Sequence, residues 1–220
     1  MSNPVKIWDL ATRVFHVALI ILVAGAFITV NLGDEWMRLH GQIGLTILSL
    51  LIFRVFWGIF GGHWSRFSSF SLKPSLVFAY LRNRSITTQT YPGHNPVGSW
   101  SSLTMIVCLL LQAITGLCSD DEVLFSGPLV PLLSEQQVEW ATFYHSEIGQ
   151  PLIILLVTIH VVAVIFYKFI LKNDLITPMI TGFKQTLEAF TSSNDSVTMR
   201  IFAMISFCII FSLIWFYLKV

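Results

Sequence analysis

Charged residues are scarce in this chain of 220 residues. Asp, Glu, Lys and Arg together make up 11% of it, whereas 55% of the residues are hydrophobic and the mean hydropathy is +0.74. A sizeable soluble domain needs a charged surface, so this composition indicates an integral membrane protein. The formal net charge of +1 argues against nucleic acid as a partner.

Cysteine is also scarce, and two processing or attachment motifs are missing. Cys108, Cys118 and Cys208 lie in or beside apolar stretches, so no disulfide framework is expected. No A-x-A cleavage site follows the first apolar stretch, which we therefore interpret as a retained helix rather than a signal peptide. A C-x-x-C-H segment, the motif for covalent attachment of a cofactor, is absent as well.

Long apolar runs are what the chain has in abundance. Five of them are long enough to cross a hydrocarbon core of about 30 Å. None alternates with a period of two, so we expect five transmembrane helices in an all-α integral membrane bundle. The predicted spans are 14–31, 40–61, 99–118, 145–168 and 200–218.

The charges are divided unevenly between the connections. The connection between the second and third spans holds only basic charges, and the connection between the third and fourth holds only acidic ones. By the positive-inside rule, the N-terminus is cytoplasmic, and five spans then place the C-terminus and the acidic loop in the periplasm of a bacterial inner membrane. The two sets are Arg66, Lys73, Arg82 and Arg84, and Asp120, Asp121, Glu122, Glu135 and Glu139.

Four histidines lie within or at the ends of the spans, and they pair by depth. In the predicted topology His16 and His160 lie near the cytoplasmic face, and His40 and His145 lie near the outer face. On the fourth span the two histidines are about 22 Å apart along the helix axis. An ionisable side chain inside a bilayer is costly and is usually functional. The alternative is four polar residues that neighbouring helices satisfy.

Imidazole is a common axial ligand of haem iron, and a bis-histidine site leaves no open position for oxygen. The two pairs therefore predict two stacked haems, an inner one between His16 and His160 and an outer one between His40 and His145. Both would be non-covalent haem b, because the covalent attachment motif is absent.

Glycines and arginines near the histidines are candidate haem contacts. Gly44 and Gly149 each follow a histidine by one turn, where a missing side chain would let a macrocycle lie against the backbone; helix packing is the alternative. Arg54 is the only charge far inside a span. Its fork suits a haem propionate, although its long stem could instead reach the headgroups.

Two further residues have two interpretations each. Arg13, one turn before His16, fits either a propionate contact or a charge that sets topology. His94 precedes the third span in a Gly-His-Asn-Pro segment, which fits a structural turn and helix entry. The alternative for His94 is a propionate contact or a proton relay beside a quinone pocket.

Several short motifs together resemble the bacterial cytochrome b561 family, a grouping that includes the b-type cytochrome subunit of nickel-iron hydrogenases. The resemblance covers about residues 5–185, and it implies a four-helix dihaem core with the four histidines above as ligands. It also implies electron exchange between the quinone pool and a redox partner. The motifs are W-D-L-x-x-R-x-F-H at 8–16, L-H-x-x-x-G at 39–44, F-R-V-F-W-G at 53–58, G-H-N-P at 93–96 and M-I-T-G at 179–182.

The chain departs from that family pattern in two places. Relatives usually have the two ligands of the fourth helix one residue closer together, so we expect a kink or bulge near residues 150–151. The fifth helix lies outside the dihaem domain of residues 1–185. Its segment, 186–220, could dock a partner, dock a second copy of the chain, or only anchor the protein.

Two of the connections between spans have sequence patterns that are typical of short helices. The segment after Pro74 predicts a short helix in the membrane interface. The spacing of Phe183, Leu187 and Phe190 predicts a second one.

We therefore expect a membrane cytochrome b that relays electrons between quinone and a periplasmic partner, either a hydrogenase or a cytochrome c. The acidic loop suits a basic partner. One alternative is a self-contained quinone reductase that oxidises a small species such as superoxide. Another is a transporter that binds a transition metal such as zinc, which would need histidines and carboxylates converging on one site.

Overall fold

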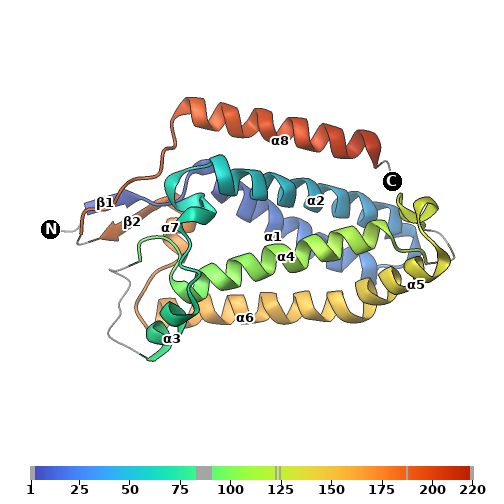
Figure 1. The fold of residues 1–220 in the computed structure, drawn as a ribbon, viewed down its shortest axis with the longest axis horizontal. Coiled ribbons are helices and arrows are strands. Elements are labelled where there is room, and N and C mark those ends of the chain that lie inside the picture. Colours follow the sequence, from blue (N-terminus) through green and yellow to red (C-terminus); the bar gives the residue numbers. More distant parts are fainter. Residues whose placement is uncertain (1–2, 83–90, 122, 124, 187, 219–220) are drawn as a thin grey trace. The chain divides into compact units, whose positions relative to one another are not determined.

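The computed structural model describes residues 3–82, 91–121, 123, 125–186 and 188–218 (Figure 1). Its long helices are α1 (Leu10–Asn31), α2 (Met37–Phe60), α4 (Pro96–Leu117), α6 (Gln150–Phe169) and α8 (Val197–Tyr217). The shorter elements are α3 (Pro74–Arg82), α5 (Glu135–Phe143), α7 (Ile176–Thr181), and the strands β1 (Asn3–Lys6) and β2 (Phe183–Thr186).

Five helical segments are long and apolar enough to cross a membrane, which confirms the number of predicted spans. The second is the most enclosed, with 56% of its most apolar stretch buried against 6–17% in the others. Exposed apolar side chains on the other four are what a lipid environment requires. The segments are Leu10–Asn31, Asp34–Phe60, Pro96–Leu117, Glu135–Phe169 and Val197–Tyr217.

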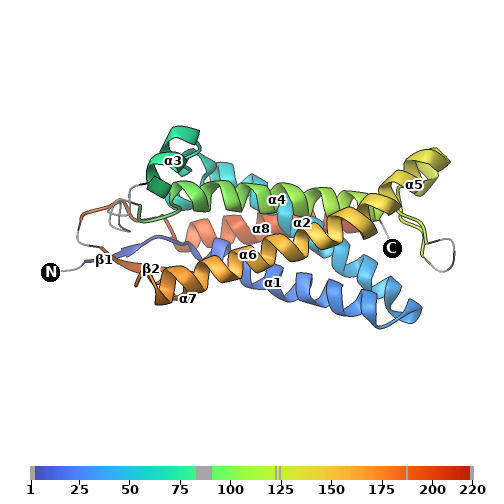
Figure 2. The same ribbon diagram turned by 90° about the horizontal axis from the view of Figure 1, so that it is seen from below.

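The fourth segment begins earlier than the hydrophobic pattern predicted. Ser134 and Gln137 form a capping box, in which the Gln137 amide donates to the Ser134 hydroxyl and the Gln137 side chain accepts from the Ser134 amide. Such a box starts a helix without any apolar stripe. α5 therefore holds Glu135 and Glu139, and it runs into α6 through a π-helical turn, Tyr144–Gly149, with no loop between them (Figure 2).

A small sheet interrupts the otherwise helical fold. β1 and β2 pair antiparallel, with Asn3 opposite Thr186 and Lys6 opposite Phe183, and they lie side by side in Figure 1. Gly182 ends α7 at φ 89°, a left-handed conformation that favours glycine. Its carbonyl accepts from the amides of Ile7 and Trp8.

One of the two short helices predicted in the connections is confirmed. α3 forms from Pro74 onward as expected, and its place in the membrane interface stays a prediction. The helix predicted from Phe183 and Phe190 is wrong, because the chain after Gly182 pairs with β1 instead of coiling. Leu187, the middle residue of that pattern, lies outside the described residues.

The chain divides into two compact units. Unit 1 comprises Met1–Val14, Arg54–Thr104 and Val157–Met204, and its apolar core is built on Val5, Ile7 and Trp8. Unit 2 comprises Phe15–Phe53, Met105–Leu156 and Ile205–Val220. Its core is built on Leu45, Leu48 and Leu117, and the end of α8 packs on it through Ile214, Trp215 and Leu218.

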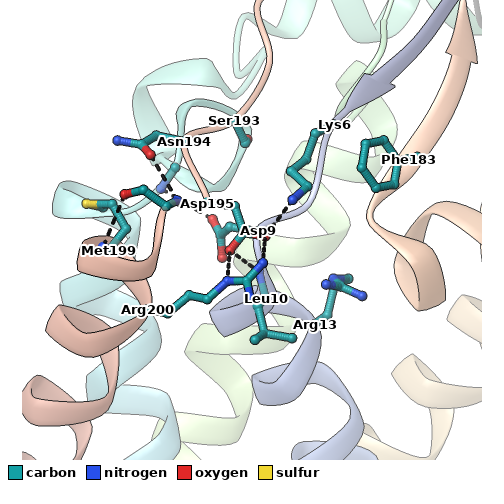
Figure 3. A network of polar contacts seen from close by, with 12 residues as sticks. Lys6, Asp9, Leu10, Arg13, Phe183, Ser193, Asn194, Asp195, Met199 and Arg200 are labelled. Atoms are coloured by element: carbon teal, nitrogen blue, oxygen red, sulfur yellow. Dashed lines mark hydrogen bonds and ion pairs between the residues drawn. The ribbon is translucent and has the colours of Figure 1, made fainter.

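Asp195 ties three segments of unit 1 together (Figure 3). Its side chain is 2% exposed and accepts from Lys6 Nζ at 2.8 Å, from Arg200 Nη2 at 2.9 Å and from the Leu10 amide at 3.1 Å. Leu10 opens α1, so the carboxylate caps that helix from a distant part of the chain. Burial alone would raise the pKa of Asp195, but the hydrogen bonds from Arg200, Lys6 and Leu10 outweigh it and hold the pKa well below its usual value.

Replacement of Asp195 should loosen the base of α1 and α8. We expect Asp195→Ala to lower the free energy of unfolding by about 2 kcal/mol, because charged hydrogen bonds are lost and the Leu10 amide is left without its acceptor. Part of the Arg200 contribution is screened by solvent. Thermal unfolding in detergent, followed by circular dichroism, measures the change.

The same stabilisation depends on pH. A carboxyl group with a depressed pKa contributes stability that is present above its unfolded value, near 4, and is lost as the pH falls below it. The Asp195→Ala protein should therefore lose less stability in acid than the parent. Glu188→Gln, at an exposed carboxylate of the same connection, is the control, and equal acid sensitivity of parent and Asp195→Ala would contradict the assignment.

Candidate functional site

His40 and His145, both in unit 2, are held in the same way. His40 lies in the first turn of α2, and its Nδ1 donates to the carbonyl of Ala26 on α1 at 3.0 Å. His145 lies in the π turn, and its Nδ1 donates to the carbonyl of Gln112 on α4 at 2.9 Å. A carbonyl can only accept, so each Nδ1 carries the proton and each Nε2 keeps its lone pair.

A threonine hydroxyl adjoins each of these contacts. Thr29 Oγ1 shares its hydrogen between the carbonyls of Gly25 at 2.9 Å and Ala26 at 3.0 Å, and it lies 3.3 Å from His40 Nδ1. Thr115 Oγ1 shares its hydrogen between the carbonyls of Leu111 at 2.8 Å and Gln112 at 3.1 Å, and it lies 3.5 Å from His145 Nδ1. The backbone carbonyls that accept from the two rings are partners of the kind that fix the orientation of a metal-ligating imidazole.

The separation of the two rings fits one metal between them. Their centroids are 6.2 Å apart and their planes are crossed at 87°. With metal–nitrogen bonds of about 2 Å on each side, two imidazoles on one metal have centres roughly 6 Å apart. The residues present therefore fit a bis-histidine haem at the predicted outer position.

The three glycines around this pair have different neighbours. A Cβ atom added to Gly44 would meet nothing within 4 Å, so open space adjoins α2 one turn after His40. At Gly116 a Cβ atom would lie 2.7 Å from His145 Cε1. At Gly149 it would overlap Oε1 of Gln112, which favours helix packing for this glycine; the predicted contact of Gly44 with a macrocycle stays a prediction.

The π turn confirms the predicted bulge in the fourth span. A π turn holds one more residue than an α turn, and Tyr144–Gly149 lies directly before the predicted position. Its physical cause is Pro151, which has no amide hydrogen for an α-helical bond to the residue four positions earlier. The Gln150 amide bonds instead to the His145 carbonyl, five residues back.

The predicted inner ligands lie on α1 and α6. His16 and His160 are each half-buried, and they belong to different units of the structure. Their pairing across one haem stays a prediction.

Arg54 lies in a buried polar network of unit 1 that the sequence had not indicated. Arg54 is 3% exposed, and its guanidinium donates to the Ser65 carbonyl at 3.1 Å and lies 5.0 Å from the centre of the Phe67 ring. Asp9 supplies the opposite charge. The guanidinium is thus held within the protein rather than among headgroups, and its contact with a propionate stays a prediction.

Asp9 is the residue that sequence reasoning missed, although an aspartate directly before an apolar run is a helix-capping signal. It is 1% exposed, and its carboxylate accepts from the Thr12 amide at 2.8 Å, Trp57 Nε1 at 3.1 Å and Ser65 Oγ at 2.5 Å. Asp9 therefore caps α1 and connects it to the end of α2.

Arg13 and His94 have structural contacts. Arg13 Nη1 donates to the Ile180 carbonyl at 2.6 Å, at the end of α7. The His94 ring makes an edge contact with Trp8 and a tilted contact with Phe70, at centroid distances of 4.8 and 4.7 Å. Asn95 next to it caps α4 by accepting from the Gly98 amide at 2.7 Å, so the segment forms the predicted turn and helix entry.

The Asn95 side chain also joins two tyrosines. Its Nδ2 donates to the hydroxyls of Tyr80 and Tyr167, each at 3.1 Å, and these hydroxyls are 2.9 Å apart. Burial, followed by the hydrogen bond between the two tyrosine hydroxyls, raises the pKa of Tyr80 well above its usual value. Tyr80 is therefore neutral at neutral pH.

Most of this chain matches the sequence pattern of a known protein family. The model of the prokaryotic cytochrome b561 family matches residues 7–182. The chain belongs to this family. The resemblance inferred from the short motifs is thereby confirmed, and this cytochrome is a multi-pass membrane protein whose family implies b-type haem and haem-based electron transfer.

The match ends before α8, which lies outside the matched residues. Comparison with curated proteins and with solved structures finds no significant match. Within the described ranges, no group of three or more His, Cys, Asp or Glu side chains is arranged so that it could hold a metal ion.

The buried pair of charges in unit 1 gives a testable prediction. We expect Asp9→Asn to lower the free energy of unfolding by about 3–5 kcal/mol, because it leaves the Arg54 charge buried without its counter-charge. Asp9→Asn combined with Arg54→Met should be less destabilised than Asp9→Asn alone. Asp174→Asn, at an exposed carboxylate, is the control; additive effects of the two changes would show that Asp9 and Arg54 act independently.

Proposed function

We propose that this cytochrome relays electrons between membrane quinone and a basic redox partner in the periplasm, through two non-covalent haem b groups. His40 and His145 would hold the outer haem, and His16 and His160 the inner one, with the N-terminus in the cytoplasm. The observation that carries this proposal is the matched bonding of the outer histidines, whose Nδ1 atoms are both committed to carbonyls.

This bonding suits electron transfer. Haem b supplies a reversible one-electron couple when bound. The two imidazoles would occupy both axial positions and so exclude oxygen. The Ala26 and Gln112 carbonyls would hold the two imidazoles in a fixed orientation toward a bound haem. The apolar helices around them exclude water.

A cleft in unit 2 supports a basic partner on the periplasmic side. The cleft lies between α5 and the connection from the third to the fourth span, and its volume is about 970 Å³. Ser146 and Glu147, the two residues after His145, form part of its lining. A cation docked here would therefore be close to the proposed outer ligand. The acidic residues of the lining are Asp120, Glu135, Glu139 and Glu147; Glu122 lies outside the described residues.

On the cytoplasmic side, the polar group beside His94 supports quinone exchange. Reduction of a quinone takes up protons, and the Asn95, Tyr80 and Tyr167 groups are linked by hydrogen bonds that could conduct them. Lys184 is half-buried nearby and donates to the carbonyls of Tyr91 and Pro92 at 3.3 Å. Burial lowers its pKa to about 8, so it could exchange a proton near neutral pH.

The first test is the optical spectrum of the purified protein. We expect reduced b-type bands with two haems per chain. His145→Ala should remove the outer haem and spare the inner one, and His160→Ala should do the reverse. A colourless protein would overturn the proposal, and loss of both haems or of neither in the two variants would overturn the pairing.

The second test concerns the acidic cleft. Glu135→Lys with Glu139→Lys should slow electron transfer to or from a soluble basic cytochrome c about tenfold at low salt, because rim charges set the association rate. The difference should shrink as salt screens the charges. Glu188→Lys, at a site in unit 1, is the matched control; an unchanged rate in the double variant would show that the partner docks elsewhere.

A further inference from the structure

Gln112 contacts His145 with both its main chain and its side chain. The Gln112 carbonyl accepts from His145 Nδ1 at 2.9 Å, and the Gln112 side-chain Nε2 donates to the His145 carbonyl at 2.9 Å. A single residue of α4 thus fixes the imidazole and the backbone of the same histidine. Because the His145 carbonyl can only accept, the amide nitrogen of Gln112 must face it.

This double contact is made where the fourth span departs from α-helical geometry. His145 lies in the π turn, where its carbonyl receives the amide of Gln150 rather than an α-helical bond. Pro151 has no amide hydrogen to donate in this region. The side chain of Gln112 supplies a second donor to the His145 carbonyl.

Gly149 makes room for this side chain. Oε1 of Gln112 is buried, has no hydrogen-bond partner within the described part of the chain, and occupies the place of a Cβ atom on residue 149. Any larger residue at position 149 would displace the side-chain amide of Gln112. The glycine thus belongs to the contact between α4 and the π turn.

His40 lies in the regular helix α2, so its backbone does not need a hydrogen bond from a side chain. Its Nδ1 atom bonds to the Ala26 carbonyl and lies beside Thr29. The two proposed ligands of the outer haem are therefore fixed by different means. Among the described residues, a side chain bridges to the backbone of His145 and none is seen to do so at His40.

We propose that Gln112 is a positioning residue for His145, and that Gly149 is required because it admits the Gln112 amide. This inference rests on the proposed role of His145 as a haem ligand. Gln112 sets the direction of the imidazole, and hence the angle between the two ligand planes, which is 87° in the structure. Crossed ligand planes give a ferric haem a strongly anisotropic low-spin electron paramagnetic resonance signal.

The first experiment replaces the amide with a side chain of the same length, in Gln112→Met. We expect the outer haem to lose its strongly anisotropic signal, to change its midpoint potential, and to be retained about 10- to 100-fold less tightly. The inner haem should be unchanged and serves as an internal reference. Gln42→Met, the same substitution two residues after His40, should leave both haems as in the parent.

The second experiment tests the link between Gln112 and Gly149. Gly149→Ala should reproduce the Gln112→Met spectrum, because the added Cβ displaces the amide. In a Gln112→Ala background, where that space is empty, Gly149→Ala should add no further change. An effect of Gly149→Ala that is equally large in both backgrounds would instead place the glycine against the macrocycle and overturn the inference.

The outcomes separate this inference from the proposed function. If the parent protein binds no outer haem, or His145→Ala retains it, the proposed function fails. If the parent binds two haems and Gln112→Met leaves the outer signal and potential unchanged, only the positioning role of Gln112 fails. If Gln112→Met does not fold, the comparison of Gly149→Ala in the parent and Gln112→Ala backgrounds still decides.

Discussion

A polar nitrogen buried among apolar helices must have a hydrogen-bond partner, and this requirement organises unit 2 of the protein. The Nδ1 atoms of His40 and His145 meet it with carbonyls of α1 and α4. Because a carbonyl cannot donate, the bond fixes the tautomer as well as the orientation of each ring. The ring separation of 6.2 Å follows from where these two carbonyls lie. The chemistry of the site thus depends on the backbone of helices that supply no ligand to it.

Carboxylates have the corresponding role in unit 1. Asp9 caps α1 from within the chain, and Asp195 caps the same helix from the segment before α8. Each carboxylate also supplies the opposite charge to a basic side chain: Asp9 to Arg54, and Asp195 to Lys6. The start of α8 is therefore bound to α1 although it lies beyond the matched residues of the family. The fifth helix is attached through specific contacts at its start, and its end packs on the core of unit 2.

Several of the short motifs that identify the family are structural in this chain. The aspartate of the first motif is the cap of α1, the asparagine of Gly-His-Asn-Pro is the cap of α4, and Gly182 is a left-handed helix end that pairs with the chain before α1. The first motif also ends at His16, and the second contains His40. The motifs therefore combine residues that begin and end helices with proposed haem ligands.

The sequence by itself determined the membrane class, the five spans, the histidine positions and the need for a bulge in the fourth span, because hydropathy, spacing and proline act locally along the chain. It did not determine what each of those side chains touches. Three contacts join residues that are distant in sequence. β1 pairs with β2, Asp9 is buried against Trp57 and Ser65, and the Gln112 amide packs against Gly149. Only the tertiary structure decided these contacts, since a hydrogen bond between distant segments leaves no periodic signal in the sequence of either one.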